Sequence, residues 1–342
     1  MTKKSKITIL GGGSWGTVLA NIAAENGSDV SLWLRDQALS YEINKHHRNS
    51  KYVPSLELSE NLTSTTLMSE ALDETNLIII CVPSSSFRLV LNEAKKFISK
   101  DAFLISATKG IEGKGFKLMS QIMEEELGSK NFIGVLSGPN LALEISLGHL
   151  SGTVIASKHK ELKQLTSRVF NTSSFRVYTS DDYFGVELGG ALKNIYALAC
   201  GIADGLGGGE NTEGMIITRG LAEMSRFAVA LGADPMTFLG LSGVGDLITT
   251  CASPLSRNHA VGKYIGEGKT LDEALRLIGQ TAEGLKTLKL VRIKSIELEL
   301  KMPIVDSLYR IIFENEPLDG SVEKLLGKDE LKDVEFSTNL KS

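Results

Sequence analysis

This sequence of 342 residues contains few cysteines, no long hydrophobic run and no large excess of positive or negative charge. The three cysteines, Cys81, Cys200 and Cys251, are widely spaced and form no CxxC pair, so the sequence suggests neither a disulfide framework nor a zinc site. The longest uninterrupted apolar run, residues 77–82, is far shorter than the roughly 18 residues that a membrane-spanning helix requires. We therefore expect no membrane insertion.

The charge balance gives little reason to expect a polyanionic partner. Lysine and arginine number 37 against 41 acidic residues, a net charge of −4, which argues against nucleic-acid binding. The five histidines show no metal-ligand spacing, so no metal site is expected. The apolar stretch after the N-terminus is too short for a signal peptide, and we expect a cytoplasmic protein.

The pattern of predicted elements changes near the middle of the chain. Short β-rich runs occur at 7–10, 30–34, 77–82, 103–106, 132–136, 153–156 and 175–178. Amphipathic helical patterns lie between some of them, and this alternation predicts a parallel sheet covered on both faces. Beyond residue 181 the patterns are helical, at 188–202, 212–231, 271–278 and 283–300. We predict an α/β fold: an N-terminal Rossmann-type doubly wound domain over 1–181, then an all-α C-terminal domain over 182–342.

A glycine motif stands between the first predicted strand and the first predicted helix. Gly11, Gly13 and Gly16 form a G-x-G-x-x-G sequence. The first glycine permits a tight turn, the second lets the backbone approach a pyrophosphate, and the third lets helix and strand pack closely. The motif predicts dinucleotide binding, and the alternative is a glycine-rich turn without a ligand.

The end of the second predicted strand bears on the choice of cofactor. Arg35 and Asp36 stand where NAD-binding proteins usually carry an acidic residue for the ribose hydroxyls. Arg35 could pair with the 2′-phosphate of NADP, or it could simply be a solvated side chain, and Asp36 leaves NAD possible. The choice stays open, with NADPH slightly favoured.

Two loops follow strands at the edge of the sheet where ligands of open α/β folds bind. Lys109 lies in the first loop, and Gly138 and Asn140 lie in the second. Each loop could face cofactor or substrate, and each could equally be an ordinary connection.

Lys193 lies inside a predicted helix, shortly after Gly189 and Gly190. Glycine in a helix interior costs up to about 1 kcal/mol relative to alanine, which implies a packing or access reason. We expect the missing side chains to open space toward Lys193, where a partly desolvated lysine could act as general acid or base. The alternative is a surface lysine beside a close helix crossing.

Two further segments carry polar groups suited to a ligand. Asp246 follows a glycine-dense stretch, where it could orient an ammonium group or cap a helix. Ser256, Arg257 and Asn258 combine hydroxyl, guanidinium and amide donors, a chemistry suited to phosphate, although a capped helix start would look the same.

Seven segments of the sequence together resemble motifs of the soluble NAD(P)-dependent glycerol-3-phosphate dehydrogenases. They are GGGSWGT at 11–17, CVPS at 81–84, ATKGIE at 107–112, SGPNLALEI at 137–145, GALKN at 190–194, GVGDLITTC at 243–251 and SPLSRN at 253–258. Their order and spacing match the family along nearly the whole chain.

The resemblance implies reversible hydride transfer between sn-glycerol 3-phosphate and dihydroxyacetone phosphate, supplying glycerol 3-phosphate for phospholipid synthesis. It also implies a cytoplasmic homodimer, with Lys193 as the proton-transferring residue. The implied substrate positions are Lys109, Gly138, Asn140, Lys193, Asp246, Ser256, Arg257 and Asn258. The implied cofactor positions are Gly11, Gly13, Ser14, Trp15, Gly16, Arg35, Lys109, Ala142, Arg257, Thr281 and Glu283.

Two other functions share part of this pattern. A Rossmann dehydrogenase for another hydroxy acid or keto acid would carry the glycine motif but has no reason to carry SPLSRN at 253–258. A non-enzymatic NADP sensor would need the glycines but not Lys109, Lys193 and Asp246, all of which this chain has.

Overall fold

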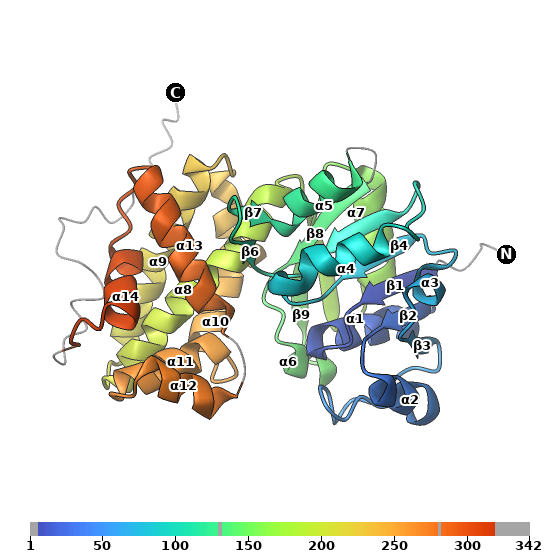
Figure 1. The fold of residues 1–342 in the computed structure, drawn as a ribbon, viewed down its shortest axis with the longest axis horizontal. Helices are drawn as coiled ribbons and strands as arrows, with labels where there is room; N and C mark the ends of the chain where they lie inside the picture. The colour runs from blue at the N-terminus through green and yellow to red at the C-terminus, as the bar shows by residue number, and fades with distance from the viewer. Residues whose placement is uncertain (1–5, 129–131, 280–281, 319–342) are drawn as a thin grey trace. The chain divides into compact units, whose positions relative to one another are not determined.

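The computed structural model describes residues 6–128, 132–279 and 282–318. The chain divides into two compact units, Met1–Gly190 (unit 1) and Ala191–Ser342 (unit 2). Unit 1 is an α/β unit and unit 2 is helical in its described part (Figure 1). The expected fold class, a Rossmann-type unit followed by an all-α unit, is confirmed.

Unit 1 is built on an eight-stranded sheet with the order β10-β9-β8-β5-β4-β1-β2-β3. Its strands are β1 (Lys6–Leu10), β2 (Asp29–Trp33), β3 (Leu62–Thr65), β4 (Leu77–Ile80), β5 (Phe103–Ser106), β8 (Phe132–Ser137), β9 (Ser151–Ala156) and β10 (Phe175–Ser180). All the strands expected from the sequence are present. The sequence analysis missed β3, whose residues are mostly threonine and serine, and the two-residue strands β6 (Ile111–Glu112) and β7 (Lys117–Leu118).

One strand pair departs from the predicted parallel sheet. β8 and β9 are antiparallel, with Ser137 paired to Val154, whereas the other neighbouring strands of the sheet are parallel. A parallel return needs a crossover that spans the length of a strand. The connection between β8 and β9 contains only the five-residue helix α6 (Ala142–Ser146), which is shorter than the strands it joins. The chain therefore re-enters the sheet in the opposite direction.

Helices cover both faces of the sheet (Figure 1). The helices α1 (Ser14–Glu25), α6 and α7 (Lys160–Phe170) pack on one face, and α3 (Met68–Leu72), α4 (Phe87–Ala94) and α5 (Met119–Leu127) pack on the other. The strand β4 shows why both faces are buried. Leu77 and Ile79 join the core beside α1, while Ile78 and Ile80 join the core beside α4. A further helix, α2 (Gln37–His46), packs beside β3.

The described part of unit 2 contains the rest of α8 (Tyr183–Gly205) and further helices. These are α9 (Glu210–Ala230), α10 (Asp246–Ala252), α11 (Arg257–Gly266), α12 (Leu271–Ile278), α13 (Glu283–Glu297) and α14 (Pro303–Phe313). Asp182 caps the start of α8, because its side chain accepts a hydrogen bond from the backbone N–H of Gly185 at 2.9 Å.

α8 and α11 pack with their main chains in direct contact. A Cβ atom at Gly201 would lie 2.0 Å from the carbonyl oxygen of His259, and one at Gly262 would lie 2.1 Å from that of Leu198. No side chain fits at either glycine, so these residues set how closely the two helices approach. This crossing fixes the position of the first turn of α11 relative to α8.

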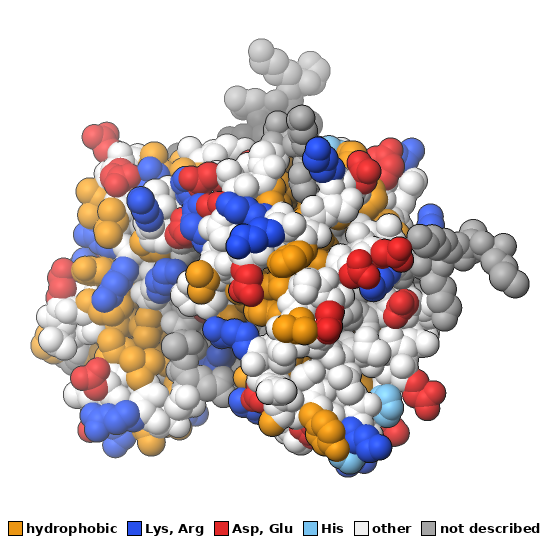
Figure 2. All heavy atoms as spheres, turned by 45° about the vertical axis from the view of Figure 1, so that its right-hand side comes forward, with side chains coloured by type: hydrophobic (Ala, Val, Ile, Leu, Met, Phe, Trp, Pro, Cys, Tyr) orange, Lys and Arg blue, Asp and Glu red, His pale blue; other side chains and the backbone are white. Residues whose placement is uncertain are grey.

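The surface carries charges of both signs. In the face drawn in Figure 2, lysine and arginine side chains are interspersed with aspartate and glutamate. In the described part of the chain, no helix combines the length and the hydropathy needed to cross a bilayer.

Candidate functional site

The glycine loop of unit 1 joins β1 to α1 and is shaped by contacts with the neighbouring chain. Gly11 has φ +124°, and a Cβ there would lie 2.5 Å from the carbonyl oxygen of Cys81. A Cβ at Gly16 would lie 1.9 Å from the carbonyl oxygen of Gly11, whereas nothing lies within 4 Å of one at Gly13. The loop is thus close-packed toward the sheet and open at Gly13, beside the first N–H groups of α1. A pyrophosphate fits such a loop.

The two residues after Gly13 hold the start of α1 in place. The Ser14 hydroxyl donates a hydrogen bond to the carbonyl oxygen of Tyr52 at 3.1 Å. The partly buried ring of Trp15 lies 6.2 Å from that of Phe175, centroid to centroid. Ser14 and Trp15 therefore stand at the loop, as the sequence predicts, and both also contact other parts of unit 1.

Arg35 and Asp36 follow β2 and have different surroundings. The Asp36 carboxylate caps α2 by accepting the backbone N–H of Leu39 at 3.1 Å, and Lys51 Nζ lies 3.4 Å from its second oxygen. The hydrogen bond from Leu39, followed by that from Lys51, lowers the pKa of Asp36. Arg35 is exposed. The carboxylate is engaged by the helix cap, and the exposed guanidinium beside it suits an anionic group better than a ribose hydroxyl.

Lys109 and Gly138 meet at the edge of the sheet where the parallel strands end. The Lys109 ammonium donates a hydrogen bond to the carbonyl oxygen of Gly138 at 2.8 Å. Asn140 faces β9 instead: its amide donates to the carbonyl oxygen of Gly152 at 3.2 Å and accepts the Thr153 hydroxyl at 3.0 Å. Ala142, a further expected cofactor position, begins α6. The structure therefore brings Lys109 and Gly138 together and anchors Asn140 beside them.

Gly190 does not open space toward Lys193, contrary to the sequence-based expectation. The volume that its side chain would fill is occupied by the hydroxyl of Ser137 and the stem of Lys109. The sequence interpretation correctly expected a packing reason for this helical glycine. It assigned that reason to the wrong lysine, because only the folded chain shows which loop lies against α8.

Lys193 lies in unit 2 as one member of a buried cluster between α8 and α10. Its side chain is 9% exposed, that of Asp246 is 1% exposed, and the ammonium contacts a carboxylate oxygen of Asp246. It also donates to the Thr250 hydroxyl at 2.6 Å, and that hydroxyl donates to the backbone carbonyl oxygen of Asp246, also at 2.6 Å. Because the carboxylate compensates the ammonium, the lysine can stay charged while buried.

The first turn of α11 gathers the other expected substrate residues of unit 2. Ser256 caps the helix, its hydroxyl accepting the backbone N–H of His259 at 3.3 Å, and Arg257 is the first helical residue. The buried Asn258 amide donates to the side-chain oxygen of Asn194 at 2.9 Å and accepts the backbone N–H of Gly284 at 2.9 Å. These two bonds fix the orientation of the amide and leave its second N–H for another acceptor.

Glu283, an expected cofactor residue, is the first residue of α13. The next residue, Gly284, donates its backbone N–H to the side chain of Asn258. Thr281 lies outside the residues that the structure describes.

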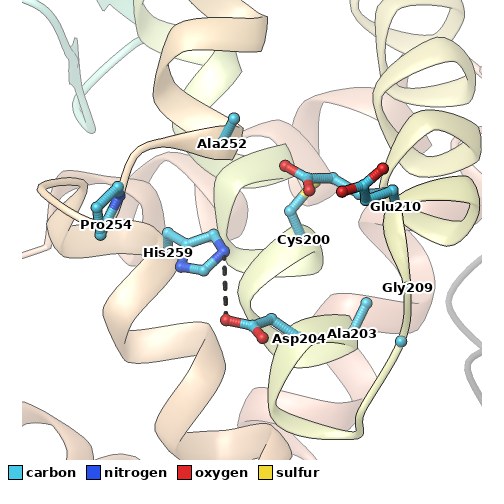
Figure 3. A pocket seen from close by; sticks show the side chains of 10 residues that line it. Cys200, Ala203, Asp204, Gly209, Glu210, Ala252, Pro254 and His259 are labelled. Atoms are coloured by element: carbon cyan, nitrogen blue, oxygen red, sulfur yellow. Dashed lines mark ion pairs between the residues drawn. The ribbon is translucent and has the colours of Figure 1, made fainter.

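A cavity of about 340 Å³ in unit 2 is lined by residues of α8, α9, α10 and α11 and of the segments between them. Figure 3 labels Asp204, Glu210 and His259 in its lining. Glu213 also lines the cavity. His259 Nε2 lies 3.9 Å from a carboxylate oxygen of Asp204, and burial lowers the pKa of His259. Carboxylates repel a phosphate, so this cavity has the wrong charge for one, whereas the donors of Arg257 and Asn258 have the right one.

The sequence analysis did not single out two residues that complete these clusters. Thr250 contacts Lys193, and it lies one helical turn beyond Asp246, so the i, i+4 spacing was a usable signal. Asn194 follows Lys193 directly, but its bond to Asn258 depends on the packing of α8 against α11. Among the described residues, no cluster of three histidine, cysteine, aspartate or glutamate side chains could hold a metal ion.

The fold of unit 1 and its glycine loop place the chain in the class of Rossmann-type NAD(P)-dependent oxidoreductases. Two family models match it: the NAD-dependent glycerol-3-phosphate dehydrogenase N-terminus over residues 6–163 and the C-terminus of the same family over residues 182–323. The chain therefore belongs to the NAD-dependent glycerol-3-phosphate dehydrogenase family, as the resemblance predicted.

Individual relatives agree with this assignment over nearly their whole length. The glycerol-3-phosphate dehydrogenase (NAD(P)+) of Alcanivorax borkumensis is 49% identical, over 98% of this chain and 97% of the relative. The enzyme of the same name from Acinetobacter baylyi is 50% identical, over 97% of this chain and 92% of the relative. A crystal structure of glycerol-3-phosphate dehydrogenase from Coxiella burnetii superposes with a TM-score of 0.89 at 36% identity, covering 95% of this chain and 99% of that one.

Proposed function

We propose that this protein catalyses reversible hydride transfer between sn-glycerol 3-phosphate and dihydroxyacetone phosphate, with NADPH or NADH as the cofactor. The observation that carries the proposal is the buried lysine of α8, whose ammonium is held by Asp246 and Thr250. A buried, compensated ammonium is a suitable proton donor to an oxygen that gains charge during reduction. The relatives named above are called glycerol-3-phosphate dehydrogenases, which supports the choice of substrate.

In the reducing direction, Lys193 acts at the C2 oxygen of the ketone. When bound, a reduced nicotinamide would supply the hydride that C2 of the ketone accepts. As the C–H bond forms, the electron pair of the C=O π bond moves to oxygen, and Lys193 gives that oxygen a proton. Asp246 keeps the ammonium charged and fixes its direction, and Thr250 holds a second N–H.

We assign the phosphate of the substrate to donors of unit 2. Ser256, Arg257 and Asn258 lie together at the start of α11, where helix N–H groups also favour an anion. Lys109, Gly138 and Asn140 are proposed as further substrate residues on unit 1. Binding energy from the phosphate is then available to orient C2 toward the nicotinamide.

The cofactor is assigned to the glycine loop and the residues around it. Gly11, Gly13 and Gly16 would hold the pyrophosphate, and Arg35 would pair with the 2′-phosphate, which favours NADPH slightly over NADH. The remaining proposed contacts are Ser14, Trp15, Lys109, Ala142, Arg257, Thr281 and Glu283. We also propose that the protein works as a cytoplasmic homodimer and supplies glycerol 3-phosphate for phospholipid synthesis.

The test is oxidation of NADPH and of NADH by the purified protein, with dihydroxyacetone phosphate and with unphosphorylated dihydroxyacetone. We expect fast turnover with the phosphorylated ketone alone, and faster turnover with NADPH. Absence of turnover despite measurable NADPH binding would overturn the proposal. Equal rates with both ketones would overturn the phosphate assignment.

A further inference from the structure

Ser137, the last residue of β8, carries a hydroxyl group that the proposed mechanism does not use. The side chain is 1% exposed, and its oxygen has no hydrogen-bond partner among the described residues. A buried hydroxyl without a partner destabilises the folded state, so such groups are uncommon in native proteins. Nearby buried serines differ in this respect: the Ser157 hydroxyl donates to the carbonyl oxygen of Ile133 at 2.7 Å.

The hydroxyl lies in a small space that only a glycine leaves open. A Cβ atom at Gly190 would lie 2.4 Å from the Ser137 oxygen and 3.5 Å from both Cγ and Cε of Lys109. The serine oxygen and the lysine stem therefore meet the same point of α8. The ammonium at the end of that stem donates to the carbonyl oxygen of Gly138, the residue after Ser137.

We propose that Ser137 is a positioning residue for Lys109, an inference that rests on the proposed function. The hydroxyl accepts a second N–H of the Lys109 ammonium when substrate binds, while the Gly138 carbonyl accepts the first. Two fixed oxygens restrict the directions in which the ammonium can point, which orients it for the anionic substrate. The Ser137 hydroxyl thus raises substrate affinity without touching the substrate.

The decisive variant is Ser137→Ala, measured for turnover and for thermal stability. We expect KM for dihydroxyacetone phosphate to rise roughly ten-fold, because a hydrogen bond to a charged group is lost. We expect kcat to stay within about two-fold. The unfolding temperature without ligand should not fall, because the hydroxyl removed has no partner there. The matched control is Ser157→Ala, which should lower the unfolding temperature and leave KM unchanged.

A double-mutant cycle with Lys109→Ala tests whether Ser137 acts through the lysine. In the Lys109→Ala background, Ser137→Ala should leave KM for dihydroxyacetone phosphate unchanged. A wild-type KM in the single variant, or an equal rise in KM in both backgrounds, would overturn this inference alone. A wild-type protein without turnover would overturn the proposed function and this inference with it.

Discussion

At the scale of single residues, Lys193 is the side chain on which the proposed chemistry depends. We expect Lys193→Ala to lower kcat by roughly 10²–10⁴-fold, the usual contribution of a positioned general acid, while NADPH affinity stays unchanged. Steady-state kinetics and a fluorescence titration with NADPH measure the two quantities. A kcat within about three-fold of the wild type would show that the role is wrongly assigned.

Lys193→Arg is the matched control for the loss of the positive charge in the Lys193→Ala variant. The alanine variant leaves Asp246 buried without its partner, which destabilises the fold as well as removing the acid. Arginine keeps a cation beside Asp246, but its guanidinium does not give up a proton at ordinary pH. Both variants should therefore lose turnover, and the arginine variant should retain more of the wild-type unfolding temperature.

Arg35 is expected to separate the two cofactors. Because it is exposed at the end of β2, Arg35→Ala removes a partner for the 2′-phosphate without disturbing the core. KM for NADPH should rise about ten-fold, and KM for NADH should change by less than two-fold. Equal changes for both cofactors would remove Arg35 from the cofactor site.

Residue types and spacing were enough to nominate Lys109, Lys193 and Asp246, and to suggest that Asp246 orients an ammonium group, which its contact with Lys193 confirms. The contact of Lys109 with Gly138 is visible only once the chain is folded. Nothing in the sequence indicates that the Ser137 hydroxyl lacks a hydrogen-bond partner, since a serine at the end of a strand is common. Its absence of a partner is a property of three segments packed together.

At the scale of elements, the crossing of α8 and α11 leaves no room for a side chain at Gly201 or Gly262. We expect Gly201→Ala to destabilise unit 2 by about 1–3 kcal/mol, because the new Cβ would lie 2.0 Å from the carbonyl oxygen of His259. Forcing the helices apart should also weaken the Asn194–Asn258 hydrogen bond and raise KM for dihydroxyacetone phosphate. Thermal unfolding and steady-state kinetics measure the two effects.

Gly214→Ala on α9 is the control for the change of residue type. Nothing lies within 4 Å of a Cβ at Gly214, so alanine should stabilise this helix by up to about 1 kcal/mol. If both glycine variants had the same stability as the wild type, the close approach of α8 and α11 would not limit the fold.

Elements with strong periodicity were predictable and weak ones were not. The helix expected at 271–278 is present as α12 with those bounds, and the strands beside the core are all found. β3 was not predicted because threonine and serine make up most of this four-residue strand. Its place in the sheet comes from pairing with β2. The antiparallel direction of β9 was not predicted, because hydrophobic periodicity identifies a strand without giving its orientation.

At the scale of the whole molecule, two buried carboxyl groups couple stability to pH. Burial raises the pKa of Glu187 to about 7 and that of Glu223 to about 8, above an ordinary value of 4.5. A raised pKa in the folded state stabilises the protein fully below pH 4.5, and this stabilisation is lost as pH rises through 7 and 8. We expect the unfolding temperature to fall between pH 5 and pH 8.5.

Glu223→Gln should reduce that fall. Glutamine stays neutral at every pH and keeps an oxygen for the backbone N–H of Ile304, which Glu223 accepts at 2.6 Å. Glu93→Gln, at an exposed position of α4, should keep the wild-type slope. Identical slopes in the wild type and in the Glu223 variant would mean that this carboxyl group does not set the pH response.

The reversed strand β9 also determines where the proposed ligand-binding edge of unit 1 stops. Because Ser137 pairs with Val154, residues 151–153 of β9 overhang the end of β8, and β10 follows them in register. The overhang forms a side wall beside residues 138–140, joined to them by the Asn140 hydrogen bond to Gly152. Because the main chain forms this wall, substitution of its side chains should leave the shape of the wall unchanged. The width of the binding edge is therefore set by the direction of one strand.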